Sequence, residues 1–140
     1  MPTDTKANDA AINAWLRGHG IRSTNQRVEI ARVLFARCLH LSADDIFRLV
    51  NDACQRVSKA TVYNTLSLFV EKGLIRQVMA APSKIFYDSN PAPHHHFYDV
   101  STGKLTDIDA TNVKVSGLPP LPEGTTMEGV DVVVRLRHNQ

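Results

Sequence analysis

The chain has 140 residues, of which 43% are hydrophobic, and a formal net charge of +2. This length suits one ordinary domain or two small ones, and this composition excludes wholesale disorder. The sequence holds no apolar run of about 18 residues and no apolar signal core in residues 1–9, so we expect a cytoplasmic protein without a membrane partner.

The charge is unevenly distributed along the chain. Residues 10–87 contain eleven Lys or Arg against five Asp or Glu, a balance of +6. Residues 88–140 contain four against seven, a balance of −3, and residues 1–9 add −1. A basic first part and an acidic second part suggest that the first part binds a polyanion and that the second part has a different role.

Four helices are predicted in the first part. The first covers residues 10–19 and is broken by the glycines around its end. The second begins at a cap supplied by Ser23 or Thr24 and runs to about Cys38. The expected apolar positions of these two helices are Ile12, Trp15, Leu16 and His19, and Val28, Ala31, Leu34 and Phe35.

The third and fourth helices carry clearer boundary signals. Ser42 caps the third helix, and Asp45 stands at its capping-box position. The fourth helix covers residues 59–72, is opened by Ser58 and is terminated by Gly73. Their expected core positions are Ile46, Leu49 and Val50, and Val62, Leu66 and Phe69.

After the fourth helix the pattern becomes β-like. Residues 74–79 and 84–88 predict two strands around a short turn, and helices followed by such a hairpin describe a winged helix. The following segment, 89–93, contains two prolines and is the obvious hinge. Beyond it we expect strands over 94–100, 104–108 and 130–136, and an irregular stretch with three prolines over 113–123.

These elements predict an α+β protein of two parts. An N-terminal winged helix-turn-helix domain covers residues 1–88, and a small β-rich dimerisation domain covers residues 94–140. The second domain has few large apolar groups and would be marginal alone, since small domains bury a small fraction of their surface. Burial against a second copy would stabilise it, so we expect a homodimer.

The fourth helix has the pattern of a DNA-recognition helix. Arg56, Lys59, Tyr63 and Ser67 fall within about one quadrant of the helical wheel, beside the apolar seam. One stripe can then pack on the domain while its neighbour enters the major groove. A polar face that is merely solvated is the alternative, but the preceding helix, the hairpin and the local basic excess favour DNA binding.

Further contacts to DNA are expected at the start of the second helix, which suits phosphate or the minor groove. On the fourth helix, lysine can reach phosphate or guanine, tyrosine a thymine methyl group, and asparagine adenine. The predicted DNA-binding residues are Arg22, Thr24, Arg27, Ser58, Lys59, Thr61, Tyr63 and Asn64.

Three consecutive histidines, His94, His95 and His96, form the strongest chemical signal. On a strand, His94 and His96 face one way and His95 the other. Two imidazoles on one side, with carboxylates nearby, suit Fe²⁺, Zn²⁺ or Mn²⁺. Neutral imidazole also ligates haem iron, so all three are candidate haem-binding residues. A solvated polar hinge segment is the alternative interpretation of the three histidines.

The two cysteines, Cys38 and Cys54, fit neither a disulfide framework nor a zinc clamp and are expected to be helix-packing thiols.

Four motifs, in order and spacing, resemble the ferric uptake regulator (Fur) superfamily over about residues 10–110. They are Gly-Ile-Arg-Ser-Thr-Asn-Gln-Arg (20–27), His-Leu-Ser-Ala-Asp-Asp-Ile (40–46), Ser-Lys-Ala-Thr-Val-Tyr-Asn-Thr-Leu (58–66) and Glu-Lys-Gly-Leu-Ile (71–75). The resemblance implies a dimeric winged-helix transcriptional repressor that binds an A·T-rich inverted repeat. It implies that Tyr63 reads bases and that Arg22 enters the minor groove. The family usually has Arg at the position of Asn64, so the operator preference is expected to differ.

The same resemblance implies a mixed nitrogen and oxygen metal site that joins the two domains. Its matching positions are His40, Asp88, His96 and Asp107, and the adjacent His94 is a further candidate. Occupancy by one divalent ion would fix the angle between the two winged helices. Taken singly, His40 could instead be a loop or cap residue, and each aspartate a solvated carboxylate at a strand end.

The chain departs from the family at its second half. Asp99 and Thr102 stand where Fur proteins usually carry Cys-x-x-Cys, and the tail lacks a cysteine pair, so no structural zinc held by four thiolates is expected. The second regulatory site looks damaged, with Lys114 near an expected carboxylate and Pro93 where a histidine often sits.

The departures resemble one branch, the iron response regulators (Irr). The matching segments are 88–98, 118–124 and 130–137. This resemblance implies control of iron and haem metabolism genes, with haem as a signal. A Fur-like sensor of Mn²⁺, Fe²⁺ or Zn²⁺ and a peroxide sensor remain alternatives. A metalloenzyme is another alternative, and it would need an open coordination position, a general base and a substrate cleft. A protein that buffers haem or metal without binding DNA is a further alternative, which a gel shift would separate from a regulator. No residue constellation demands catalysis, so we expect no enzyme.

Overall fold

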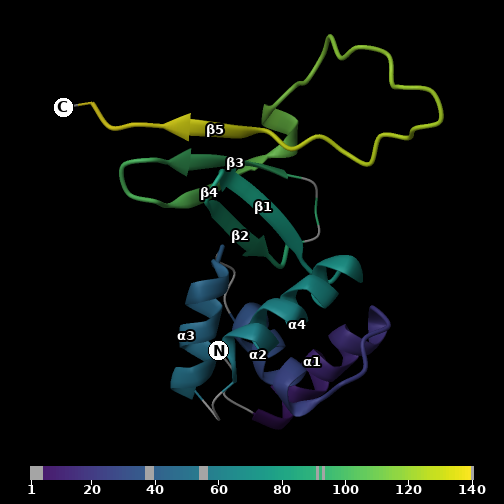
Figure 1. Cartoon of the computed structure of the whole chain (residues 1–140), viewed down its shortest axis with the longest axis vertical. Coiled ribbons are helices and arrows are strands. Elements are labelled where there is room, and N and C mark those ends of the chain that lie inside the picture. The colour runs from purple at the N-terminus through teal and green to yellow at the C-terminus, as the bar shows by residue number, and fades with distance from the viewer. Residues whose placement is uncertain (1–4, 37–39, 54–56, 91, 93, 140) are drawn as a thin grey trace. The chain divides into compact units, whose positions relative to one another are not determined.

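The computed structural model describes residues 5–36, 40–53, 57–90, 92 and 94–139. The chain divides into two compact units, residues 1–91 and 92–140. The first unit contains helices α1 (Thr5–Gly18), α2 (Asn25–Ala36), α3 (Ala43–Ala53) and α4 (Lys59–Glu71), then strands β1 (Arg76–Ala81) and β2 (Lys84–Asp88) (Figure 1). The second contains β3 (His94–Asp99), β4 (Leu105–Asp109), the 3-10 turn η1 (Ala110–Asn112) and β5 (Val133–Leu136). Helices followed by a hairpin, and then a small sheet, confirm the predicted α+β fold class.

The core of the first unit is built from apolar residues at helical spacing on all four helices. Those with at most 2% of their surface exposed are Ile12, Leu16, Ile30, Ala31, Leu34, Ile46, Val50, Val62, Leu66 and Phe69, and Leu74 just after α4 is equally buried. Burial of each large aliphatic or aromatic side chain contributes about 1.5–3 kcal/mol. The predicted seams of α3 and α4 are confirmed, except that Leu49 is partly buried.

Two predictions for α1 and α2 are wrong. The first helix begins at Thr5, ahead of the predicted residue 10. The prediction missed its first turns because they are polar and carry no apolar period. Phe35 is 45% exposed, and Ile30 takes the core position instead. The Phe35 ring lies against Trp15, with 5.8 Å between ring centroids. The predictions for Cys38, Cys54, Arg56 and Pro93 lie outside the described residues.

The start of α3 is fixed by a reciprocal capping box. The backbone N–H of Asp45 donates to the Ser42 hydroxyl at 3.1 Å, and the backbone N–H of Ser42 donates to the Asp45 carboxylate at 3.3 Å. Two N–H groups that have no partner inside the helix are thereby satisfied. The predicted capping box is confirmed.

The end of α4 explains why the first strand begins later than predicted. Gly73 has φ +77°, a left-handed conformation that favours glycine. The N–H of Gly73 donates to the Val70 carbonyl at 3.0 Å and the N–H of Leu74 to the Phe69 carbonyl at 2.9 Å. This Schellman arrangement turns Leu74 into the core, so the strand predicted from residue 74 starts at Arg76.

The hairpin that follows is antiparallel and attached to the helical layer. Its register pairs Arg76 with Asp88, and a bulge interrupts it between Met79 and Ala81. Leu41, just before α3, forms an isolated antiparallel bridge with Tyr87 through N–H···O distances of 3.3 and 2.7 Å. The segment before α3 therefore lies beside the end of β2.

The second unit is a three-stranded sheet in the order β4-β3-β5. The β3–β4 pair is antiparallel and the β3–β5 pair is parallel. The last strand is shorter than the predicted 130–136, while the proline-containing stretch over 113–123 is irregular, as predicted. The long segment between η1 and β5 loops out from the sheet (Figure 1). The apolar side chains that this segment exposes are Val115, Leu118, Leu121, Met127 and Val130.

The C-terminal tail is held by contacts to Asp99, one of the two positions where the resemblance led us to expect cysteine. The Asp99 carboxylate accepts hydrogen bonds from the backbone N–H groups of Ser101 and Thr102, at 2.9 and 3.1 Å. Its second oxygen lies 2.5 Å from His138 Nε2, and the His138 N–H donates to the Ser101 hydroxyl. Hydrogen bonds thus close this end of the sheet.

Replacing the cap of α3 should destabilise the first unit. We expect Ser42→Ala to lower the free energy of unfolding by about 1 kcal/mol, because one helix N–H loses its acceptor. Urea denaturation followed by circular dichroism measures the change. Ser67→Ala, an exposed site inside α4, is the matched control and should change stability by less than about 0.5 kcal/mol. Equal losses in both variants would contradict the capping argument.

Candidate metal centre and nucleic-acid interface

In the first unit, strand pairing brings one imidazole and one carboxylate together. The bridge between Leu41 and Tyr87 makes His40 and Asp88 neighbours, since paired segments run antiparallel there. His40 Nε2 lies 3.1 Å from Asp88 Oδ2, and their side chains are only 9% and 7% exposed. The other Asp88 oxygen accepts the Asn90 N–H at 2.8 Å. Two predicted metal ligands therefore form a buried pair with a fixed carboxylate.

In the second unit, sheet register assembles three further predicted ligands. His96 is directly opposite Asp107 in the β3–β4 pair, and His94 lies two residues earlier on the same face of β3. The Asp107 Oδ1 atom lies 3.3 Å from His94 Nε2 and 3.4 Å from His96 Nε2. The two imidazole rings meet edge to face, with 4.6 Å between centroids. We call these three residues the His-Asp trio.

The His-Asp trio fits a divalent ion. Nitrogen and oxygen ligands lie about 2.0–2.2 Å from zinc, so two ligands of a tetrahedral ion are separated by about 3.4 Å, close to the observed distances. His94 Nδ1 lies 2.5 Å from the Ala92 carbonyl and must donate to it, which leaves Nε2 as the lone-pair nitrogen of the neutral ring. Such outer contacts typically fix the tautomer of a metal-binding histidine. Asp107 is 46% exposed, so the trio is accessible on that side.

His95 lies on the opposite face of β3 and does not join the trio. Its Nδ1 accepts a hydrogen bond from the Val132 N–H at 3.0 Å. In the neutral ring the proton is then on Nε2, so His95 holds the chain that leads into β5 rather than offering a lone pair. Haem binding by the three histidines remains a prediction.

On α4 the predicted DNA-binding residues divide into two groups. Lys59, Tyr63 and Asn64 are exposed, with Tyr63 44% exposed. Ser58 instead accepts the Thr61 N–H at 3.1 Å and donates to the Thr61 hydroxyl at 2.8 Å. The first group presents exposed side chains to a ligand of the helix, whereas Ser58 and Thr61 fix where the helix begins.

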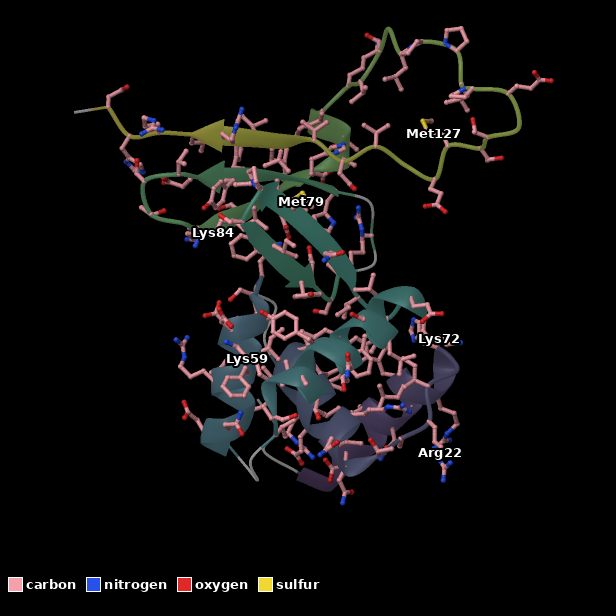
Figure 2. The ribbon with its side chains drawn as sticks, in the orientation of Figure 1. Arg22, Lys59, Lys72, Met79, Lys84 and Met127 are labelled. Carbon is pink, nitrogen blue, oxygen red and sulfur yellow. The ribbon has the colours of Figure 1, made fainter. Side chains whose placement is uncertain are left out.

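The residues predicted at the start of α2 lie close to one another. The Thr24 hydroxyl accepts the Arg27 N–H at 3.3 Å, and the Arg27 guanidinium donates to the Arg22 carbonyl at 2.9 Å. Thr24, rather than Ser23, therefore caps α2. Arg22 and Lys59 are well separated in Figure 2, so the two groups of predicted contacts form separate places on the first unit.

Asn51 is a positioning residue that the sequence pattern did not reveal. Its side-chain amide donates to the carbonyls of Phe47 and Val57 at 2.8 and 3.2 Å, and its carbonyl accepts the Val57 N–H at 2.7 Å. Val57 immediately precedes the cap of α4, so Asn51 ties the end of α3 to the start of α4. The sequence offers one signal for this role, an asparagine near a helix end, but such asparagines are too common to identify a positioning residue.

Tyr87, the bridge partner of Leu41, lies near Tyr63 of α4. Burial raises the pKa of Tyr87 and the nearby Tyr63 raises it further, whereas a hydrogen bond with Gln77 lowers it. The phenol is therefore neutral near pH 7. Tyr63 and Tyr87 line one cleft of the first unit together with Ser42, Ser83 and Ile85.

A winged helix with an exposed lysine and tyrosine on its last helix, followed by a sheet with nitrogen and oxygen metal ligands, has the features of a metal-dependent DNA-binding regulator. The model of the "Ferric uptake regulator family" matches residues 18–120. The chain belongs to this family. The predicted superfamily resemblance is confirmed, while the narrower iron response regulator branch remains a prediction.

Relatives of known function include peroxide-responsive repressors named PerR. That of Staphylococcus aureus strain Mu50 is 34% identical over 95 residues, which are 68% of this chain and 64% of the relative. That of strain USA300 is 33% identical over the same length. The chain thus matches somewhat less than two thirds of the length of these relatives.

Solved structures agree with the fold. The ferric uptake regulator of Pseudomonas aeruginosa with manganese has a TM-score of 0.70 at 24% identity, covering 91% of this chain and 98% of that one. A zinc uptake regulator complexed with zinc and DNA has a TM-score of 0.62 at 20% identity, covering 98% and 93%. At these identities the likeness concerns the fold. No helix in the described part of the chain is long and apolar enough to cross a membrane.

Neutralising the carboxylate of the trio should weaken metal binding. We expect Asp107→Asn to reduce the affinity for Co²⁺, a spectroscopic probe of such sites, by at least about tenfold, since even outer-shell changes cost 10–100-fold. Absorption titration of the apo-protein measures this. Asp109→Asn on the same strand is the matched control, because its Oδ1 is engaged by the Thr111 N–H and hydroxyl. An unchanged affinity in Asp107→Asn would contradict ligation by the trio.

Proposed function

We propose that this chain is a dimeric, metal-responsive transcriptional regulator that binds an A·T-rich inverted repeat in double-stranded DNA. The observation that carries the proposal is the presentation of α4. Val62, Leu66 and Phe69 are fully buried, which anchors one side of the helix in the core. The neighbouring side exposes Lys59 and Tyr63, as a helix that enters the major groove requires.

Both units supply side chains of the kinds that bind divalent ions. The first unit offers the His40–Asp88 pair and the second offers the His-Asp trio. We propose that one divalent ion takes ligands from both, as the family resemblance implies. The ion would supply a link that exists only when it is bound, and the chain's own residues would set the angle between the units. Ion binding and DNA binding are then coupled reciprocally.

The donor chemistry narrows the signal without naming one metal. Imidazole and carboxylate ligands suit Fe²⁺, Mn²⁺ and Zn²⁺. The narrower proposal, control of iron and haem metabolism genes in response to iron or haem, is supported by the resemblance of residues 88–98, 118–124 and 130–137 to the iron response regulators. We propose a regulatory rather than an enzymatic role, in keeping with relatives that are repressors.

Peroxide sensing is a second candidate function. The observation that favours it is the identity of 34% to a peroxide-responsive repressor. It requires redox-active iron at the histidine-rich site. Peroxide should then abolish DNA binding by the iron-loaded protein and leave the manganese-loaded protein unaffected. Equal resistance of both forms would contradict this candidate.

A homodimer is supported by the surface of the second unit. Large apolar side chains are exposed on its strands as well as on its long irregular segment. Those on or next to the strands are Phe97, Val100, Val134 and Leu136. A second copy that buries these groups would remove apolar area from water and stabilise a unit of this small size.

Removing either of two exposed side chains of α4 should weaken specific DNA binding. We expect Tyr63→Ala and Lys59→Ala each to reduce affinity for a duplex selected by the wild-type chain at least about fivefold, since a base contact is worth about 1–3 kcal/mol. Gel-shift titration at fixed salt measures this. Lys72→Ala, at the other end of α4 (Figure 2), is the control and should bind nearly as wild type. Intact specific binding in Tyr63→Ala and Lys59→Ala would show that α4 does not read DNA.

Metal dependence is tested with the same duplex. Binding should differ at least tenfold between chelator-treated protein and protein reloaded with Mn²⁺, Fe²⁺ or Zn²⁺, because a coupling of about 1.4 kcal/mol gives this factor and lies in the usual range. A haem arm runs in parallel and follows the absorption of histidine-ligated haem. Identical DNA affinity in every arm would exclude a metal- or haem-responsive regulator.

A further inference from the structure

Lys59, the first residue of α4, is held by the neighbouring helix α3. Its Nζ atom lies 3.4 Å from Asp44 Oδ1. The same ammonium lies over the ring of Phe47, 6.0 Å from its centroid. Two contacts of different kinds therefore draw the charge of Lys59 toward α3, within the first unit (Figure 2).

The partner carboxylate lies on the surface that the proposed function assigns to DNA. Asp44 lines the same cleft as Tyr63. Its side chain is 73% exposed and that of Lys59 is 62% exposed. An exposed ion pair of this kind is worth about 0.2–1 kcal/mol, so it can exchange its partners for a ligand.

The ion pair with Asp44 affects contact of Lys59 with phosphate differently from contact with a base edge. A phosphate bound to the ammonium brings a full negative charge close to the Asp44 carboxylate, and the two anions repel, whereas a base edge carries no net charge. An ammonium has three donors, so it can keep one bond to Asp44 while others reach the O6 and N7 acceptors of guanine. The pair therefore opposes contact with the backbone and is compatible with contact with a base.

We propose that Asp44 is a specificity-determining residue, which restrains Lys59 from phosphate and orients it toward base edges. The inference rests on the proposed function, in which α4 reads DNA. Binding to arbitrary sequences depends almost wholly on phosphate charge, whereas the operator adds base contacts. Asp44 thus weakens binding to arbitrary DNA more than binding to the operator.

The test compares Asp44→Asn with the wild-type chain on two duplexes. One is selected from random sequence by the wild-type protein, and the other is a scrambled duplex of equal composition. Asp44→Asn should bind the scrambled duplex more tightly, by up to about fivefold per protomer. The slope of log affinity against log salt should become steeper by about 0.9 per protomer, since one more phosphate is contacted. Affinity for the selected duplex should stay the same or fall.

Two controls isolate the pair. Asp52→Asn makes the same charge change at an exposed site later in α3 and should leave both affinities nearly unchanged. In a Lys59→Ala background, Asp44→Asn should have no effect. Thermal denaturation of each variant verifies folding.

The outcomes separate this inference from the proposed function. An equal gain on both duplexes, or a gain that persists without Lys59, overturns the role of Asp44 and leaves DNA reading by α4 intact. Failure of the wild-type chain to select any duplex overturns both.

Discussion

The burial of one side of α4 is the constraint on which the first unit depends. Val62, Leu66 and Phe69 fill the centre of the helical core, so the helix cannot rotate without exposing large apolar groups. Rotation by one residue, about 100°, would turn Tyr63 away from its present surface. The capping bonds of Ser58 and the three hydrogen bonds of Asn51 then fix where the helix starts. The orientation of the proposed DNA surface is therefore a consequence of core packing.

Sequence patterns predicted most of this fold because caps and apolar periods are local signals. The box at Ser42 and the glycine stop at residue 73 are examples, since each depends on residues within one turn of the chain. The failures have the opposite character. The apolar pattern cannot choose between Ile30 and Phe35 for the core of α2, because the choice depends on which neighbouring helices meet that face. A polar first turn, as in α1, gives no apolar signal at all.

The candidate site divides in the same way. Strand alternation predicted that His94 and His96 share a face, and family resemblance selected Asp107, which the sheet register places opposite His96. Sequence spacing alone could not select Asp107 as the partner of His96, because the register is set by how β3 and β4 pair across the turn between them. Likewise, the part that His95 plays became visible only with its bond to Val132, a residue 37 positions away.

The closure of the second unit by Asp99 and His138 has a consequence for oxidative chemistry. Both cysteines of the chain precede residue 92, so this unit contains no thiol. Where thiolates hold a zinc ion, oxidants can destroy the zinc site by converting the thiolates to disulfides. A carboxylate and an imidazole do not undergo that exchange, so oxidants leave this closure in place. Oxidative damage to the second unit would instead fall on Met127, which is exposed.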